Sequence, residues 1–147
     1  MKIAHTLKLA AAAALLVSGV AAQAQSSSYT PGTVWTFTNI QIEPGQFENY
    51  MDFLDKEYKK LNDFSVKQGY IVSYHVFQVN NARHGEPDLI LAVETKDYLT
   101  NAQQLEIQKK SEEFMAKDTR KMTTESGERK VMRKFVGGME LQELKLK

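Results

Sequence analysis

The chain has 147 residues, no cysteine and a formal net charge of +1 at neutral pH. Without cysteine it has no disulfide, no thiol nucleophile and no thiolate metal site. The near balance of 19 basic and 18 acidic residues argues against a general nucleic-acid-binding protein, which would carry a basic excess.

The first segment has the pattern of a cleavable secretory signal peptide. Lys2 and Lys8 form a basic start, an apolar run follows, and an Ala-Gln-Ala motif ends at Ala24. The apolar run is shorter than the roughly 20 residues that span a bilayer, which disfavours the alternative of an uncleaved anchor helix. We therefore predict cleavage after Ala24 and a periplasmic or secreted location.

The predicted domain plan has three parts: signal peptide 1–24, flexible leader 25–32 and one α+β domain over 33–147. About 123 residues follow the cleavage site, which is enough for one hydrophobic core and too few for two. Because cleavage removes Lys2 and Lys8, the remaining chain has 17 basic residues against 18 acidic ones. We expect neither nucleic-acid binding nor a stable membrane anchor.

The first two predicted elements are a strand over Val34–Ile42 and a helix over Gln46–Gln68. The strand is rich in β-branched and aromatic residues, and a Glu-Pro-Gly sequence ends it. In the helix, apolar residues recur at steps of three and four and form one stripe. Gly69 suits the position after the last turn, where a positive φ is usual. The stripe comprises Phe47, Tyr50, Met51, Leu54, Tyr58, Leu61 and Phe64.

The second half of the chain predicts a hairpin, further helices and a last strand. The short loop between Tyr70–Val79 and Leu89–Thr95 favours an antiparallel hairpin. Asp97 is the expected N-cap of a helix that runs to about Thr124, and Gly127 is expected to break the helical pattern. The remaining elements are a short helix over Glu128–Val136, from its i, i+1, i+4, i+5 apolar pattern, and a final strand over Met139–Leu146.

This order, β-α-β-β-α-(α)-β, predicts the split βαβ arrangement of a ferredoxin-like α+β fold. Two helices would cover one face of a four-stranded antiparallel sheet. Because side chains alternate along a strand, Trp35 and Phe37 lie on one face of the first strand, and Val34 and Ile40 on the other. An apolar second face exceeds what a soluble monomer usually exposes, so we expect a homodimer through it. Coverage within one chain, by the extra helix or by sheet twist, is the alternative.

Three segments resemble the dimeric α+β-barrel superfamily, in which two ferredoxin-like sheets pack face to face. They are Ile42–Glu48, Val93–Tyr98, and Arg133–Gly137 with the terminal Glu140–Lys145. The resemblance covers most of the chain after the signal peptide, and its motifs are architectural. The superfamily includes cofactor-independent monooxygenases, haem-degrading enzymes, small-molecule lyases and many exported proteins of unknown role. It therefore implies a fold and a dimer, but no particular reaction.

Five residues on the predicted strands are candidates for contact with a ligand. Trp35 would stack on an aromatic ring and Asn39 would orient an oxygenated group; the alternatives are a sheet-core residue and a strand-end cap. His75 is suited to proton transfer, although a lone strand histidine is more often structural. Tyr70 and Tyr74 share one face of the second predicted strand, where they would hold a ligand or bridge to a helix.

Other polar residues give weaker signals. His75 and His84 lack the spacing of metal ligands, so we predict no metal site. The basic positions Arg129, Lys130, Arg133 and Lys134 fit the solvated face of an amphipathic helix, with a weak anion or membrane-surface contact as the other interpretation.

The leading hypothesis is an exported homodimer whose sheet–helix cleft binds a small, partly apolar ligand, because the chain has no recognisable catalytic motif. An enzyme of the monooxygenase or haem-degrading type, as the resemblance implies, is the second hypothesis. It needs Trp35, Asn39 and His75 in one cavity, and whether the chain is an enzyme stays open. A structural or protein-interaction module is the third. No cofactor is predicted, with haem kept as the alternative.

Overall fold

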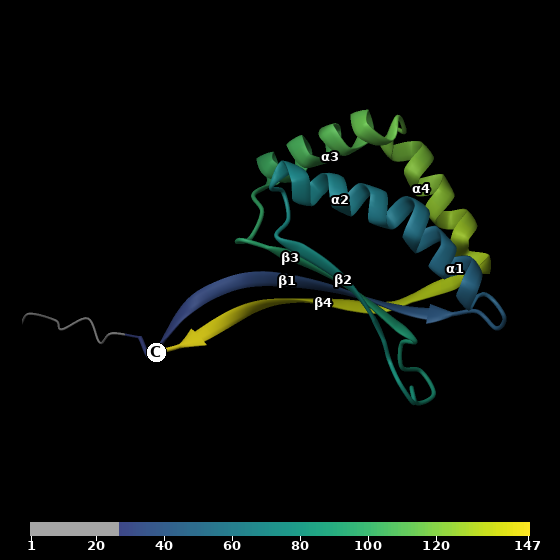
Figure 1. The fold of residues 1–147 in the computed structure, drawn as a ribbon, viewed down its shortest axis with the longest axis horizontal. Coiled ribbons are helices and arrows are strands. Elements are labelled where there is room, and N and C mark those ends of the chain that lie inside the picture. The colour runs from purple at the N-terminus through teal and green to yellow at the C-terminus, as the bar shows by residue number, and fades with distance from the viewer. Residues whose placement is uncertain (1–26) are drawn as a thin grey trace, which may run out of the picture.

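The computed structural model describes residues 27–147, so the predicted signal peptide lies outside the described residues. The strands form one layer, and α1, α2, α3 and α4 all lie on the same side of it (Figure 1). The strands are β1 (Tyr29–Ile42), β2 (Ser73–Gln78), β3 (Leu89–Thr95) and β4 (Arg133–Leu146). Their order in the sheet is β2-β3-β1-β4, and each neighbouring pair is antiparallel. The fold is α+β and ferredoxin-like, as predicted.

The longest strands of the sheet are β1 and the edge strand β4, which have 14 residues each and pair with one another from end to end. Tyr29 pairs with Leu146 at the far end of this ribbon. Positions 29–32 are therefore part of β1, and the predicted flexible leader 25–32 is too long at its C-terminal end. The physical reason is that the last residues of β4 offer backbone partners to this segment, which local composition does not reveal.

The first helical run follows the prediction closely. It consists of α1 (Phe47–Phe53), a π-helical turn η1 (Leu54–Tyr58) and α2 (Lys59–Gln68). Gly69 ends it with a φ of 74°, the left-handed conformation expected after a last turn. The predicted apolar stripe from Phe47 to Tyr58 packs in or against a core of Ile40, Tyr50, Leu54, Leu89 and Leu91, whereas Phe64 stacks on Phe114 of α3.

The second helical region starts later than predicted. The helix α3 (Asn101–Met115) begins after Thr100, whose side chain accepts a hydrogen bond from the backbone of Gln103 in a capping box. Asp97 is therefore not the N-cap. The reciprocal pair of cap hydrogen bonds between Thr100 and Gln103 satisfies two backbone N–H donors at once, which Asp97 does not achieve from three residues upstream.

The second region is also two helices, where one was predicted to about Thr124. Ala116 adopts a φ of 51° and ends α3, and α4 (Thr119–Glu128) starts after Asp118, which caps the backbone of Lys121. Gly127 lies inside α4, so its prediction as a helix breaker is wrong. Among residues 27–147, the structure contains no helix with the length and apolar character to cross a membrane.

The predicted short helix over Glu128–Val136 is wrong beyond its first turn. A single turn, η2 (Arg129–Val131), is followed directly by β4. The edge of β1 presents backbone groups up to Ile42, and pairing with the start of β4 satisfies them. A register shift between Asn39 and Ile40 interrupts the regular ladder, which explains why the apolar pattern of this segment does not alternate like an ordinary strand.

Candidate functional site

The sheet face turned away from the helices, called here the open face, carries a row of aromatic rings. Trp35 and Phe37 project from β1, and His75 and Phe77 from β2. Ring centroids are 6.0 Å apart for Trp35 and Phe37, 5.9 Å for Trp35 and His75, and 5.6 Å for His75 and Phe77. Ala92 of β3 pairs with both Phe37 and His75 and is fully buried between them. The row is therefore continuous across three strands.

The open face continues onto β4. Met139 pairs with Phe37 and Leu141 pairs with Trp35, and both β4 side chains are 50% exposed. A shallow hollow of about 440 Å³ lies on this face. Its lining residues are Trp35, Phe37, Phe77, Leu141, Gln142 and Glu143. A single chain thus leaves a broad apolar surface uncovered.

Asn39 lies on the same open face as Trp35 and His75, because all three belong to alternate positions that pair across the sheet. Its Oδ1 atom is buried and has no hydrogen-bond partner among the described residues. Gly137, opposite it on β4, leaves room beside the amide. The hollow that Trp35 lines does not include Asn39 or His75, so the three residues share a face without lining one common hollow.

The two candidate tyrosines do not lie on the open face. Tyr74 is on the helix-covered side of β2, and its hydroxyl donates a hydrogen bond of 2.6 Å to Asp63 of α2. Tyr70 precedes β2, so it does not share a strand face with Tyr74, and its ring packs edge-on against Phe64 at 6.2 Å. Both tyrosines connect the sheet to α2. The five candidate residues therefore divide between the two sides of the sheet.

A second shallow hollow, called here the α4–β4 cleft, lies between α4 and the start of β4 on the helix-covered side of the sheet. Its volume is about 620 Å³. Residues of α4 three and four positions apart supply one wall, and alternate residues of β4 supply the other. The lining residues are Thr119, Met122, Thr123, Ser126, Gly127, Lys130, Arg133 and Phe135. A cleft between sheet and helix is thus present on the side opposite Trp35, Asn39 and His75.

Arg133 is the buried cation of the α4–β4 cleft, with only 5% of its surface exposed. Its Nη2 atom donates hydrogen bonds to the carbonyl and hydroxyl oxygens of Ser126, at 3.2 and 3.0 Å. Its guanidinium lies 3.9 Å from the ring centroid of Phe135. Its Nε atom is buried and has no acceptor among the described residues. One donor of a buried charge is therefore left without a partner.

Arg129 lies near Arg133 and lines a second, smaller cavity next to the cleft. Its guanidinium lies 4.1 Å from the ring centroid of Phe53, and its Nε also lacks an acceptor among the described residues. Burial lowers the pKa of Arg129, and the neighbouring charge of Arg133 lowers it further. No ion pair among residues 27–147 includes either arginine. Two adjacent positive charges are thus present without a paired carboxylate.

A smaller cavity of about 210 Å³ lies next to the cleft, between the first helical run and the corner of α3 and α4. Met122 lines both spaces. The hydroxyl of Tyr58, which faces this region, has no hydrogen-bond partner among the described residues, and burial raises its pKa to about 12. The small cavity therefore keeps a neutral phenol at any physiological pH.

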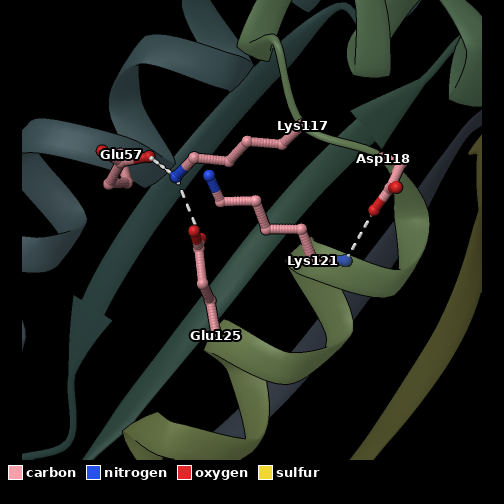
Figure 2. A network of polar contacts seen from close by, with 5 residues as sticks. All are labelled: Glu57, Lys117, Asp118, Lys121 and Glu125. Atoms are coloured by element: carbon pink, nitrogen blue, oxygen red, sulfur yellow. Dashed lines mark hydrogen bonds and ion pairs between the residues drawn. The ribbon is translucent and has the colours of Figure 1, made fainter.

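Lys117 joins the first helical run to α4 at this cavity. Its ammonium bridges Glu57 of η1 at 3.1 Å and Glu125 of α4 at 2.9 Å, while Asp118 caps the first turn of α4 at the backbone of Lys121 (Figure 2). Hydrogen bonds to the two carboxylates raise the pKa of Lys117, and the bond from Lys117 lowers the pKa of Glu125. This bridge holds α4 in place above the sheet.

We expect Lys117→Met to lower the free energy of unfolding at neutral pH, because the bridge is lost. Since the folded pKa of Glu125 is below its usual 4.5, the contribution is complete above 4.5 and is lost as the pH falls through the folded value. Urea unfolding at pH 7 and at pH 3 measures this. An equal loss for the variant at both pH values would contradict the assignment.

The burial of Arg133 was not predicted, because the sequence pattern indicated the solvated face of a helix for this residue. Arg133 pairs with Ile42, and that pairing turns its side chain toward the helices. The signal available in the sequence was the aromatic and β-branched content of Phe135 and Val136, which suits a strand. Among the described residues, no group of three or more acidic or histidine side chains is arranged to hold a metal ion.

The chain has little detectable similarity to known proteins. No protein-family model matches the chain, and no curated protein matches it. A search of solved structures finds the crystal structure of HapK from Hahella chejuensis, with 7% sequence identity and a TM-score of 0.48. The match covers 75% of this chain and 91% of that one.

Proposed function

We propose that the chain is an exported, homodimeric binding domain for a small, partly apolar molecule, and that the ligand occupies the α4–β4 cleft. The observation that carries this proposal is the composition of the cleft, in which Met122 and Phe135 stand beside a buried Arg133 with an unpartnered Nε. Small-molecule sites are mostly apolar concavities of about 300–1,000 Å³ with a few polar groups that orient the ligand. The volume of about 620 Å³ falls in that range.

Gly127 offers a direct way to close the cleft. It lines the space, lies inside α4, and a Cβ added there meets no atom within 4 Å. Leucine is also a better helix former than glycine by roughly 0.8 kcal/mol. A leucine at this position therefore adds bulk to the cleft wall without disturbing the core.

We expect Gly127→Leu to weaken the binding of cleft ligands at least tenfold while the chain unfolds at an equal or higher temperature. Cinnamate and cinnamamide serve as probes, and isothermal titration calorimetry measures their affinity. Gly127→Ala, which adds a single methyl group, is the matched control and should retain binding. The proposal is wrong if the unmodified chain binds neither probe, or if Gly127→Leu binds them as tightly as the unmodified chain.

Dimerisation through the open face is part of the proposal. A two-fold axis would bring the aromatic row of one copy against that of the other and cover Phe77, Met139 and Leu141, which are about half exposed in one chain. Glu94 also lies on this face, between Trp35 and Ser73, and it accepts a hydrogen bond of 2.6 Å from the Ser73 hydroxyl. Such packing matches the dimeric α+β-barrel architecture that the sequence resembles, and it leaves the α4–β4 cleft of each copy on the outside.

A further inference from the structure

The charges of the α4–β4 cleft indicate which kind of molecule it takes. Lys130 and Arg133 line the cleft, and its lining includes no acidic side chain. Building on the proposed function, we infer that the ligand is a small organic carboxylate, bound with its headgroup at Arg133 and its apolar body against Met122 and Phe135.

The first support is the incomplete hydrogen bonding of Arg133. Its contacts with Ser126 account for Nη2 and leave the buried Nε without an acceptor. A buried donor that lacks a partner is uncommon, and for a charged group it is costly. An oxygen anion in the cleft neutralises the charge by accepting from the part of the guanidinium that lines the cleft, since Nε itself is buried, and the fork of donors on a guanidinium suits a carboxylate.

The second support is the absence of a competing acid. Glu125 and Glu57 are engaged by Lys117, and Glu43 is engaged by Lys134 at 3.0 Å. The positive charges of Arg129 and Arg133 therefore have no internal counter-ion within salt-bridge distance among residues 27–147. A cationic ligand would be repelled here, and a neutral one would leave the charge of Arg133 unpaired.

The third support is the set of hydroxyl groups on the wall formed by α4. Thr123 and Ser126 lie three positions apart and both line the cleft, whereas the Thr119 hydroxyl, also on the lining, already donates to Glu112. Hydroxyl groups donate to an anion as readily as to a neutral oxygen, so they add polar contacts around a headgroup. Phe135, which is 58% exposed and already stacked with Arg133, supplies an apolar surface next to the charge.

The test compares four probes that share one hydrocarbon body: cinnamate, cinnamamide, cinnamylammonium and cinnamyl phosphate. Calorimetry on the full chain should give cinnamate an affinity at least tenfold higher than cinnamamide, with no binding of cinnamylammonium. Tighter binding of cinnamyl phosphate than of cinnamate would overturn the carboxylate assignment in favour of a phosphate ligand.

Substitutions test whether Lys130 and Arg133 cause the preference for cinnamate. Lys130→Gln is expected to weaken cinnamate about threefold, whereas Arg120→Gln, which removes the same charge from α4 outside the lining, should change it much less. Arg133→Lys keeps the charge but loses the guanidinium, so cinnamate should weaken about tenfold while cinnamamide is unchanged. Thermal unfolding checks that Arg133→Lys is folded. If it is not folded, the probe series and Lys130→Gln still test the preference for a carboxylate.

The outcomes separate this inference from the proposed function. Equal affinities for cinnamate and cinnamamide, both abolished by Gly127→Leu, would leave the binding site standing and overturn the carboxylate inference. Failure of all four probes to bind would overturn both. An unchanged preference for cinnamate in Arg133→Lys and Lys130→Gln would place the anion elsewhere and contradict the inference.

Discussion

Replacing Phe77 with glutamate is expected to convert the homodimer into a monomer. Phe77 stacks on His75 at the edge of the open face and is 48% exposed in a single chain. In a two-fold dimer the substitution buries two carboxylates, one from each copy, without partners. An uncompensated buried charge costs about 3 kcal/mol or more, which corresponds to a rise of at least about a hundredfold in the dissociation constant.

Light scattering coupled to gel filtration measures the mass of the variant at micromolar concentration. Gln78→Glu is the matched control, because the neighbouring side chain is exposed and points to the other side of the sheet, and it should stay dimeric. A monomeric unmodified chain, or a Phe77→Glu variant that keeps the dimer mass, would show that the open face is not the interface.

Replacing Tyr50 with alanine is expected to lower the free energy of unfolding by about 3–5 kcal/mol, the range for removing a buried aromatic ring. Tyr50 is 2% exposed, belongs to the core cluster and stacks on Phe53 with ring centroids 5.7 Å apart. Burial raises the pKa of its hydroxyl, and the charge of Arg133 partly offsets that rise. The side chain thus belongs to the core and lies close to Arg133.

Urea denaturation followed by circular dichroism measures the loss. Tyr50→Phe keeps the ring and removes only the hydroxyl, so it should cost about 1 kcal/mol. A loss for Tyr50→Ala no larger than that for Tyr50→Phe would contradict the packing account, because it would assign the whole effect to the hydroxyl.

The elements with a strong periodic pattern could be predicted from the sequence. Leu89–Thr95 has the predicted bounds, and the first helical run differs by one residue at its start, because local patterning and Gly69 act together there. The start of β4 could not be predicted this way. Its strand conformation depends on pairing with β1, a contact between segments about ninety residues apart in the sequence.

The features of the candidate site that depend on local sequence patterns could also be predicted, and those that depend on long-range packing could not. Alternation along a strand correctly placed Trp35 and His75 on faces, but it could not show that helices cover the face carrying Tyr74 and leave the other open. The burial of Arg133 could not be predicted, because it results from two features that differ from the prediction. Arg133 belongs to a strand where a short helix was expected, and α4 is a separate helix where one unbroken helix was expected. Once α4 turns back over β4, a residue expected in solvent becomes the cation of a cleft.

The most direct test of the account is the location of a bound probe. We would record amide and methyl NMR spectra of the isotope-labelled chain while titrating cinnamate. The account predicts that the largest shifts fall on the cleft lining, at Thr123, Gly127 and Phe135, with the open face at Phe37 and Ala92 unaffected. Shifts confined to the open face would contradict the proposed site and move the ligand to the other side of the sheet.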